Sequence, residues 1–103
     1  MARAYEAYSF PPGAAVAHPA AVTSTGTANV QSIPVPKGAN AMFICAETTG
    51  ARVTFDGTTP DATHGIVIIA GAQPLFVPIG AAQSIQFVSA AAGNSIVSVL
   101  FLA

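Results

Sequence analysis

The sequence predicts an all-β fold, an antiparallel β-sandwich of jelly-roll type with about seven or eight short strands and an extended N-terminal arm. From Asn29 onward, short runs of Val, Ile, Phe and Thr are interrupted by Gly, Pro or Asn roughly every eight to twelve residues. Several of these runs alternate between apolar and polar residues, as half-exposed strands do. The alanine runs at 14–17 and 90–92 are too short, and too close to Gly or Pro, to persist as helices.

Residues 1–28 are predicted to form the arm and residues 29–103 the sandwich domain. Three prolines block a helix in the arm, namely Pro11, Pro12 and Pro19. Its low-complexity composition allows disorder. We instead expect it to lie across a neighbouring protein, because three aromatic side chains are costly to leave in water and can serve as anchors to that neighbour: Tyr5, Tyr8 and Phe10.

Strands are expected at 30–35, 41–47, 52–55, 66–70, 75–79, 84–89 and 95–102, with a marginal strand at 21–25. In the strand at 52–55, Val53 and Phe55 share one face, and in the strand at 84–89, Ile85 and Phe87 do so opposite Ser84, Gln86 and Val88. The runs SIVSVLFLA and GIVIIA are apolar on both faces, which predicts that the second face meets another subunit. Four side chains of the last strand are expected to pack within and between subunits: Ile96, Val97, Val99 and Phe101.

Charged residues are scarce and unevenly placed. Only three basic and four acidic residues occur, or 7% of the chain, where soluble domains carry roughly 25%. All seven precede residue 62, so the C-terminal half depends on His64 and neutral polar groups. A monomer with so few charges tends to self-associate, and we expect like copies to cover this half.

The same composition argues against several classes of protein. A net charge of −1 lacks the basic surface that nucleic acids require. The apolar run at the C-terminus is far shorter than the roughly 20 residues that cross a bilayer, and MARAYEAYSF has no apolar core of a secretory signal. Cys45, within AMFICAE, is expected to be a buried free thiol.

The segment FDGTTPDATHG holds most of the polar chemistry of the chain. Gly57 can take the positive φ of a tight turn, while threonine hydroxyls and aspartate carboxylates bond nearby backbone groups, so a rigid loop explains the residues. The rival hypothesis is a calcium site on Asp56 and Asp61, which would need six to eight oxygen ligands. A zinc pair of His18 and His64 is disfavoured because a full ligand set is missing.

No catalytic arrangement is indicated, and we expect neither enzymatic activity nor a cofactor or metal. The serines fall on strands as ordinary polar-face residues, without a GxSxG turn. A phosphate-binding GxxxxGK motif is missing as well.

The segment ARVTFDGTTP, followed by GIVIIAGAQP, the strand IQFV and a final apolar strand, resembles a recurrent type of small tailed-phage protein. The similarity runs from residue 51 to residue 102, half of the chain. It implies a virion structural protein with a β-sandwich, seated on the capsid as a homotrimeric head decoration (cement) protein. It supplies no catalytic or ligand-binding residues.

The leading hypothesis is therefore a non-enzymatic decoration protein that is assembled in the host cytoplasm, lies on the capsid surface and contacts the major capsid protein and copies of itself. One alternative is a spike or tail-fibre domain that binds a host glycan through the loop at 58–64. A neck or tail connector is another. Copy number in the particle distinguishes the first from the other two.

Overall fold

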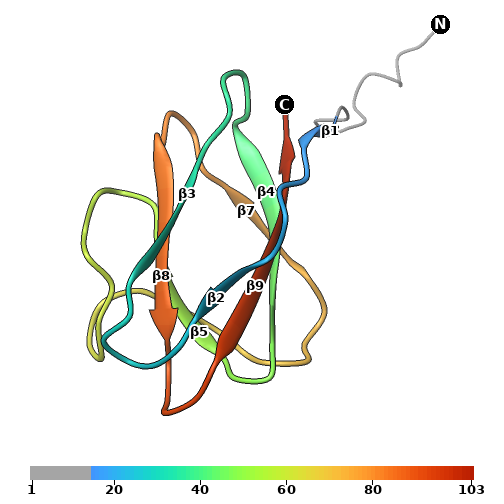
Figure 1. The fold of residues 1–103 in the computed structure, drawn as a ribbon. Coiled ribbons are helices and arrows are strands. Elements are labelled where there is room, and N and C mark those ends of the chain that lie inside the picture. Colours follow the sequence, from blue (N-terminus) through green and yellow to red (C-terminus); the bar gives the residue numbers. More distant parts are fainter. Residues whose placement is uncertain (1–14) are drawn as a thin grey trace, which may run out of the picture.

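The computed structural model describes residues 15–103 and confirms the all-β sandwich (Figure 1). Its strands are β1 (Ala15–Ala17), β2 (Val22–Ser24), β3 (Gln31–Pro34), β4 (Ala41–Glu47), β5 (Ala51–Thr54), β6 (Ile66–Ile68), β7 (Leu75–Pro78), β8 (Ser84–Ser89) and β9 (Ser95–Leu102). Residues 15–103 contain no helix, and so none that could span a membrane.

The strands pair in a nested order around the link between β5 and β6. β5 pairs with β6, β4 with β7, β3 with β8 and β2 with β9, all antiparallel. The four pairs together form one long antiparallel hairpin, which rolls up so that β4 also pairs with β9 and β5 with β8. The result is two sheets. In the five-stranded sheet the order is β1-β9-β4-β7, and β2 pairs with the same edge of β9 as β1; the four-stranded sheet has the order β3-β8-β5-β6. Such rolling is the jelly-roll arrangement.

Strand bounds follow the expected pattern most closely where the apolar run is long. β4, β8 and β9 have the predicted bounds. β6 ends at Ile68 and not at Ala70, because Ala70 forms a bridge to Ala46 of the other sheet. β1 and β2 pair with β9, which places residues 15–24 in the sandwich although they fall within the segment assigned to the arm.

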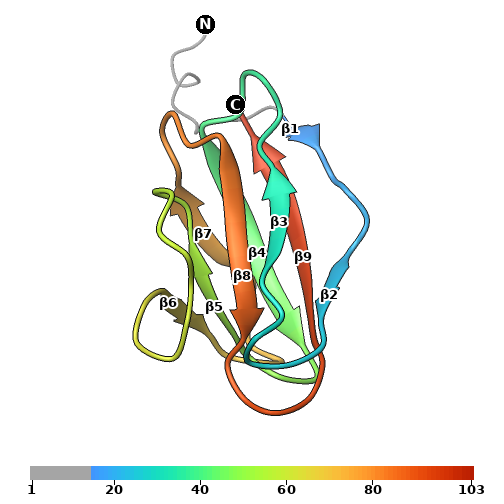
Figure 2. The same cartoon turned by 60° about the vertical axis from the view of Figure 1, so that its left-hand side comes forward.

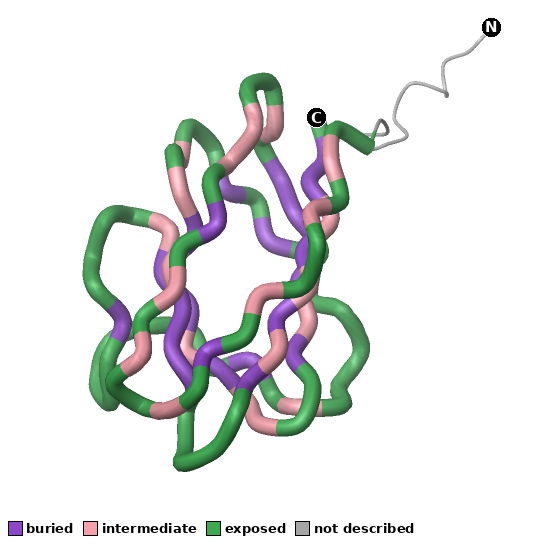
Figure 3. The backbone as a smooth tube through the Cα atoms, in the orientation of Figure 1, coloured by how far each residue is buried: buried purple, intermediate pink, exposed green. Residues whose placement is uncertain are grey.

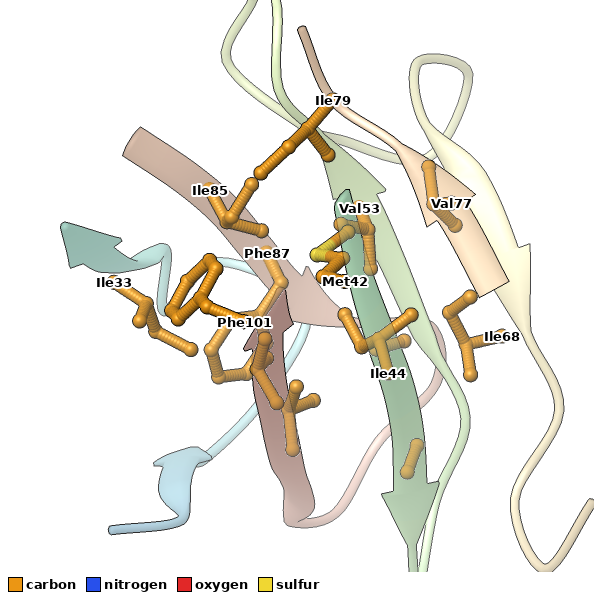
Figure 4. Close-up of a cluster of buried hydrophobic side chains, with 14 residues drawn as sticks. Ile33, Met42, Ile44, Val53, Ile68, Val77, Ile79, Ile85, Phe87 and Phe101 are labelled. Atoms are coloured by element: carbon orange, nitrogen blue, oxygen red, sulfur yellow. The ribbon is translucent and has the colours of Figure 1, made fainter. Parts of the chain in front are cut away.

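The core lies between the sheets, and buried residues alternate with more exposed ones along β4 and β9 (Figure 3). β4 contributes Met42 and Ile44, and β8 contributes Ile85 and Phe87, all at most 1% exposed. Figure 4 shows Ile33 at one side of this cluster and Ile68 with Val77 at the other. Apolar burial at roughly 25 cal/mol per Å² makes this cluster the main stabilising contribution.

The outer face of the four-stranded sheet is more covered than the alternation predicts. Val88, expected on the half-exposed face, is 1% exposed, and Thr54 is also buried. The Thr54 hydroxyl donates a hydrogen bond to the Thr58 carbonyl, so the loop after β5 folds back toward this face. Pro60 of the same loop is buried as well.

A buried serine joins the two sheets where β2 meets β8. The Ser24 hydroxyl donates to the carbonyl of Asn29 (2.6 Å) and accepts the backbone N–H of Ser89 (3.0 Å). Ser24 lies opposite Ser95 in the β2–β9 register. The Ser95 hydroxyl is also buried, but it finds no hydrogen-bond partner among residues 15–103.

These two serines provide a matched pair of substitutions. Ser24→Ala should lower the free energy of unfolding by about 1–3 kcal/mol, because it leaves the buried N–H of Ser89 and the partly buried carbonyl of Asn29 without this partner. Ser95→Ala should change it by less than about 0.5 kcal/mol or raise it, since no bond is lost. Urea unfolding measures both, and equal losses would contradict the linking role of Ser24.

The turn between β4 and β5 holds a threonine in a strained conformation. Thr48 has φ of 73°, and the N–H of Thr49 bonds the carbonyl of Glu47 (2.8 Å) across it. A β-branched residue is disfavoured in the left-handed region by roughly 1–2 kcal/mol.

Thr48→Gly should therefore raise the free energy of unfolding by about 1 kcal/mol, because glycine removes the strain at a smaller entropic cost. Thr49→Gly is the control, since Thr49 has no positive φ and glycine there only adds freedom to the unfolded chain. Thermal unfolding of both variants tests this expectation, and a loss at Thr48 as large as that at Thr49 would contradict it.

Candidate functional site

The polar loop at residues 55–65 is the tip of the nested strand pairing, between β5 and β6. Gly57 adopts φ of 92°, as the turn requires. The N–H of Thr58 donates to Asp56 Oδ1 at 3.0 Å, which lowers the pKa of the Asp56 carboxyl. The first half of the loop is thus closed by its own side chain.

Asp61 organises the second half of the loop. Its Oδ1 accepts the N–H of Thr63 (2.8 Å), the N–H of His64 (2.9 Å) and a contact from His64 Nδ1 (2.9 Å). These contacts, the Thr63 N–H foremost, hold the pKa of Asp61 far below its usual range. One carboxylate oxygen therefore accepts several hydrogen bonds from the same loop and holds its second half in place.

The residues proposed as metal ligands are not assembled into a cluster. Residues 15–103 contain no group of three or more His, Cys, Asp and Glu side chains that could hold a metal ion. Asp56 and His64 line one hollow of about 360 Å³ beside Val53 and Ile66. His18 lies elsewhere, beside Cys45 in a hollow of the five-stranded sheet. The loop is accounted for by its internal hydrogen bonds.

Of the four residues expected to pack within and between subunits, three lie in the core of their own chain. Val97, Val99 and Phe101 are at most 2% exposed. Ile96 is half-buried and, one position away from Val97, points to the outer side of β9. The anchor residues Tyr5, Tyr8 and Phe10 lie outside the described residues.

The outer side of the five-stranded sheet carries an apolar surface that the sequence analysis did not assign. Phe43 lies opposite Phe76 of β7 and Leu100 of β9, so all three share the outer face. The Phe43 and Phe76 rings pack edge to face, with centroids 5.3 Å apart and an interplanar angle of 63°. We call Phe43, Cys45, Phe76 and Leu100 the outer apolar face.

A hollow of about 430 Å³ opens on this face, lined in part by Phe43, Cys45 and Leu100. Cys45, expected to be buried, is half-buried, because its place in the alternation of β4 points it outward. Phe43 and Phe76 remain 39% and 44% exposed. Their proximity could not be predicted from the sequence, because it depends on the β4–β7 and β4–β9 registers.

The charge state of Asp61 can be tested in solution. We expect its carboxyl to titrate below 3.8 and below Asp56 in NMR-monitored acid titration. A carboxyl whose pKa is lowered by folding stabilises the fold above its unfolded pKa, and this contribution is lost as pH falls below about 4. Asp61→Asn should remove that part of the pH dependence, and an ordinary titration of Asp61 would contradict the loop geometry.

Comparisons of the chain with protein-family models, with curated proteins and with solved structures found no match. A proposal about its function therefore depends on its own residues and their arrangement.

Proposed function

We propose that this chain is a non-enzymatic structural protein of a tailed-phage particle, a head decoration (cement) protein that packs as a homotrimer on the major capsid protein. The observation that carries the proposal is the outer apolar face. Phe43, Phe76 and Leu100 form an uncharged surface on a rigid sheet, and such a surface is typical of a contact with protein.

Surface composition supports the same proposal. The accessible surface of 5363 Å² is shared among only seven charged side chains, where an average composition would supply roughly 25. A protein that is covered by neighbours on several sides needs few charges for solubility. Burial of about 1,000 Å² of mostly apolar area contributes roughly 25 kcal/mol before association costs, which suits a protein that reinforces a shell.

The loop geometry favours this function over glycan binding. Recognition of a saccharide depends on polar groups that are free to bond the ligand. Here Asp56 and Asp61 accept hydrogen bonds from Thr58, Thr63 and His64 of the same loop. The loop carboxylates are therefore already bonded within the loop, whereas the apolar side chains exposed on the sheets are free to contact another protein.

Copy number in the particle tests the proposed function. Quantitative mass spectrometry of purified particles that carry this chain should find on the order of hundreds of copies, as repetition over a symmetric shell requires. Removal of the chain should lower the temperature at which filled heads break open. A few tens of copies or fewer would instead indicate a spike, tail or neck component.

The role of the outer apolar face is tested by placing one charge on each sheet. Phe43→Lys should weaken binding to heads that lack the chain by about 2 kcal/mol or more, because it buries a charge in an apolar contact. Ser32→Lys is the control, since Ser32 is exposed on the outer side of β3 in the other sheet. Cosedimentation with such heads measures both, and equal binding by the two variants would exclude this face as the contact.

A further inference from the structure

The apolar core of the sandwich reaches the surface at one place along β6 and β7, although Ile68 and Val77 of these strands are buried. Ile66 lies directly opposite the buried Val53, and Leu75 lies opposite the buried Ile44, so both point toward the space between the sheets. Inward-facing residues of a closed sandwich are covered. Ile66 and Leu75 are nevertheless 47% and 43% exposed, so the apolar core continues to the surface here.

The opposite side of the sandwich, formed by β2 and β3, is closed. Ile33 of β3 is 3% exposed, and Val22 of β2 packs against the core. Ser24 and Ser89 bond across the two sheets at this side. Figure 2 shows β6 and β7 on one side of the molecule and β2 on the other. The exposure is therefore a local property of one edge, not of the whole sandwich.

The segment that links β6 to β7 exposes a further apolar side chain to solvent. Ile69 is 69% exposed, the most exposed of the large apolar residues among those described. Its position is fixed, because Gly71 donates to the Ala46 carbonyl (3.1 Å) and Ala72 to the Ile69 carbonyl (3.3 Å). Val67, 48% exposed, lies on the outer face of the edge strand β6, opposite Arg52. We call Ile66, Val67, Ile69 and Leu75 the open edge.

Charge and area indicate what covers the open edge. Residues 65–103 contain no Asp, Glu, Lys or Arg, and the ionised groups beside the open edge have opposite signs. The Arg52 guanidinium donates to the Gly65 carbonyl (3.4 Å), and Asp56 lines the hollow beside Ile66. Two copies can therefore approach each other with a cation of one facing a carboxylate of the other. Fully open side chains of this size expose very roughly 150–200 Å², which leaves on the order of 400 Å² of apolar area on the open edge. Two such areas approach the roughly 1,000 Å² that a specific interface needs once its rim is included.

We propose that the open edge is the contact between copies of this chain, and that a neighbouring copy completes the core left open between β6 and β7. β6 and β7 each pair on one side only, with β5 and β4 respectively. An uncovered apolar edge strand is a ready template for association with another chain. This inference deepens the proposed function by naming the surface through which the copies pack.

Charge substitutions at two exposed positions test the proposal in the full chain. Ile69→Lys, alone and combined with Val67→Lys, places a charge on the open edge, where lysine blocks strand association. Val30→Lys is the matched control, because Val30 is also partly exposed (37%) but precedes β3 on the closed side. Thermal unfolding at low concentration verifies that each variant is folded.

Sedimentation velocity over a roughly hundredfold concentration range gives the readout. The parent chain and Val30→Lys should form the same oligomer, and the open-edge variants should raise its dissociation constant at least about tenfold. Hydrogen exchange at Ile66–Ile68 should slow with rising concentration in the parent chain and in Val30→Lys, but not in the open-edge variants. If an open-edge variant does not fold, Ile69→Thr replaces it and should give a smaller shift in the same direction.

The inference is overturned if the parent chain stays monomeric, if the open-edge variants associate as it does, or if Val30→Lys loses association equally. These outcomes are separate from those that test the proposed function. A monomeric chain at high copy number in the particle refutes the open-edge contact and leaves the decoration role. Association through the open edge with only a few copies per particle refutes the decoration role and leaves the contact.

Discussion

The nested pairing of strands around a single tip is the constraint on which the rest of the structure depends. Because β2 pairs with β9, β3 with β8, β4 with β7 and β5 with β6, rolling of this long hairpin leaves β2 and β3 at one side and β6 and β7 at the other. Ser24 and its hydrogen bonds close the first side. At the second side the inward-facing Ile66 and Leu75 are exposed, so the core reaches the surface.

Few ionised groups surround the exposed apolar side chains of this chain, and this favours association with other proteins. Most globular proteins surround exposed apolar side chains with ionised groups, which limit association. In this chain the outer apolar face and the open edge are made by residues from β4, β6, β7 and β9 together with Ile69, which follows β6, and Glu47 is the only ionised residue of those four strands. Two apolar surfaces on different sides of one sandwich suit a subunit that contacts both a support and its own copies.

Much of the fold could be predicted from local patterns, and much of the candidate site could not. The alternation in SIQFVS and the long runs in AMFICAE and SIVSVLFL fixed β8, β4 and β9, because each strand carries its own periodicity. AVA of β1 carries none, and it became a strand only through pairing with β9. The outer apolar face joins Phe43, Phe76 and Leu100, whose proximity depends on registers between distant segments. The buried state of Val88 likewise depends on tertiary cover that alternation does not report.

The central claim is that protein neighbours cover the apolar surfaces that the sandwich cannot cover itself. A cryo-EM reconstruction of the assembled particle tests it most directly, since it displays every contact of the chain at once. The account predicts a neighbouring copy against Ile66, Ile69 and Leu75 and a different protein surface against Phe43. A map in which both surfaces face solvent, with contacts made through other parts of the chain, would contradict it.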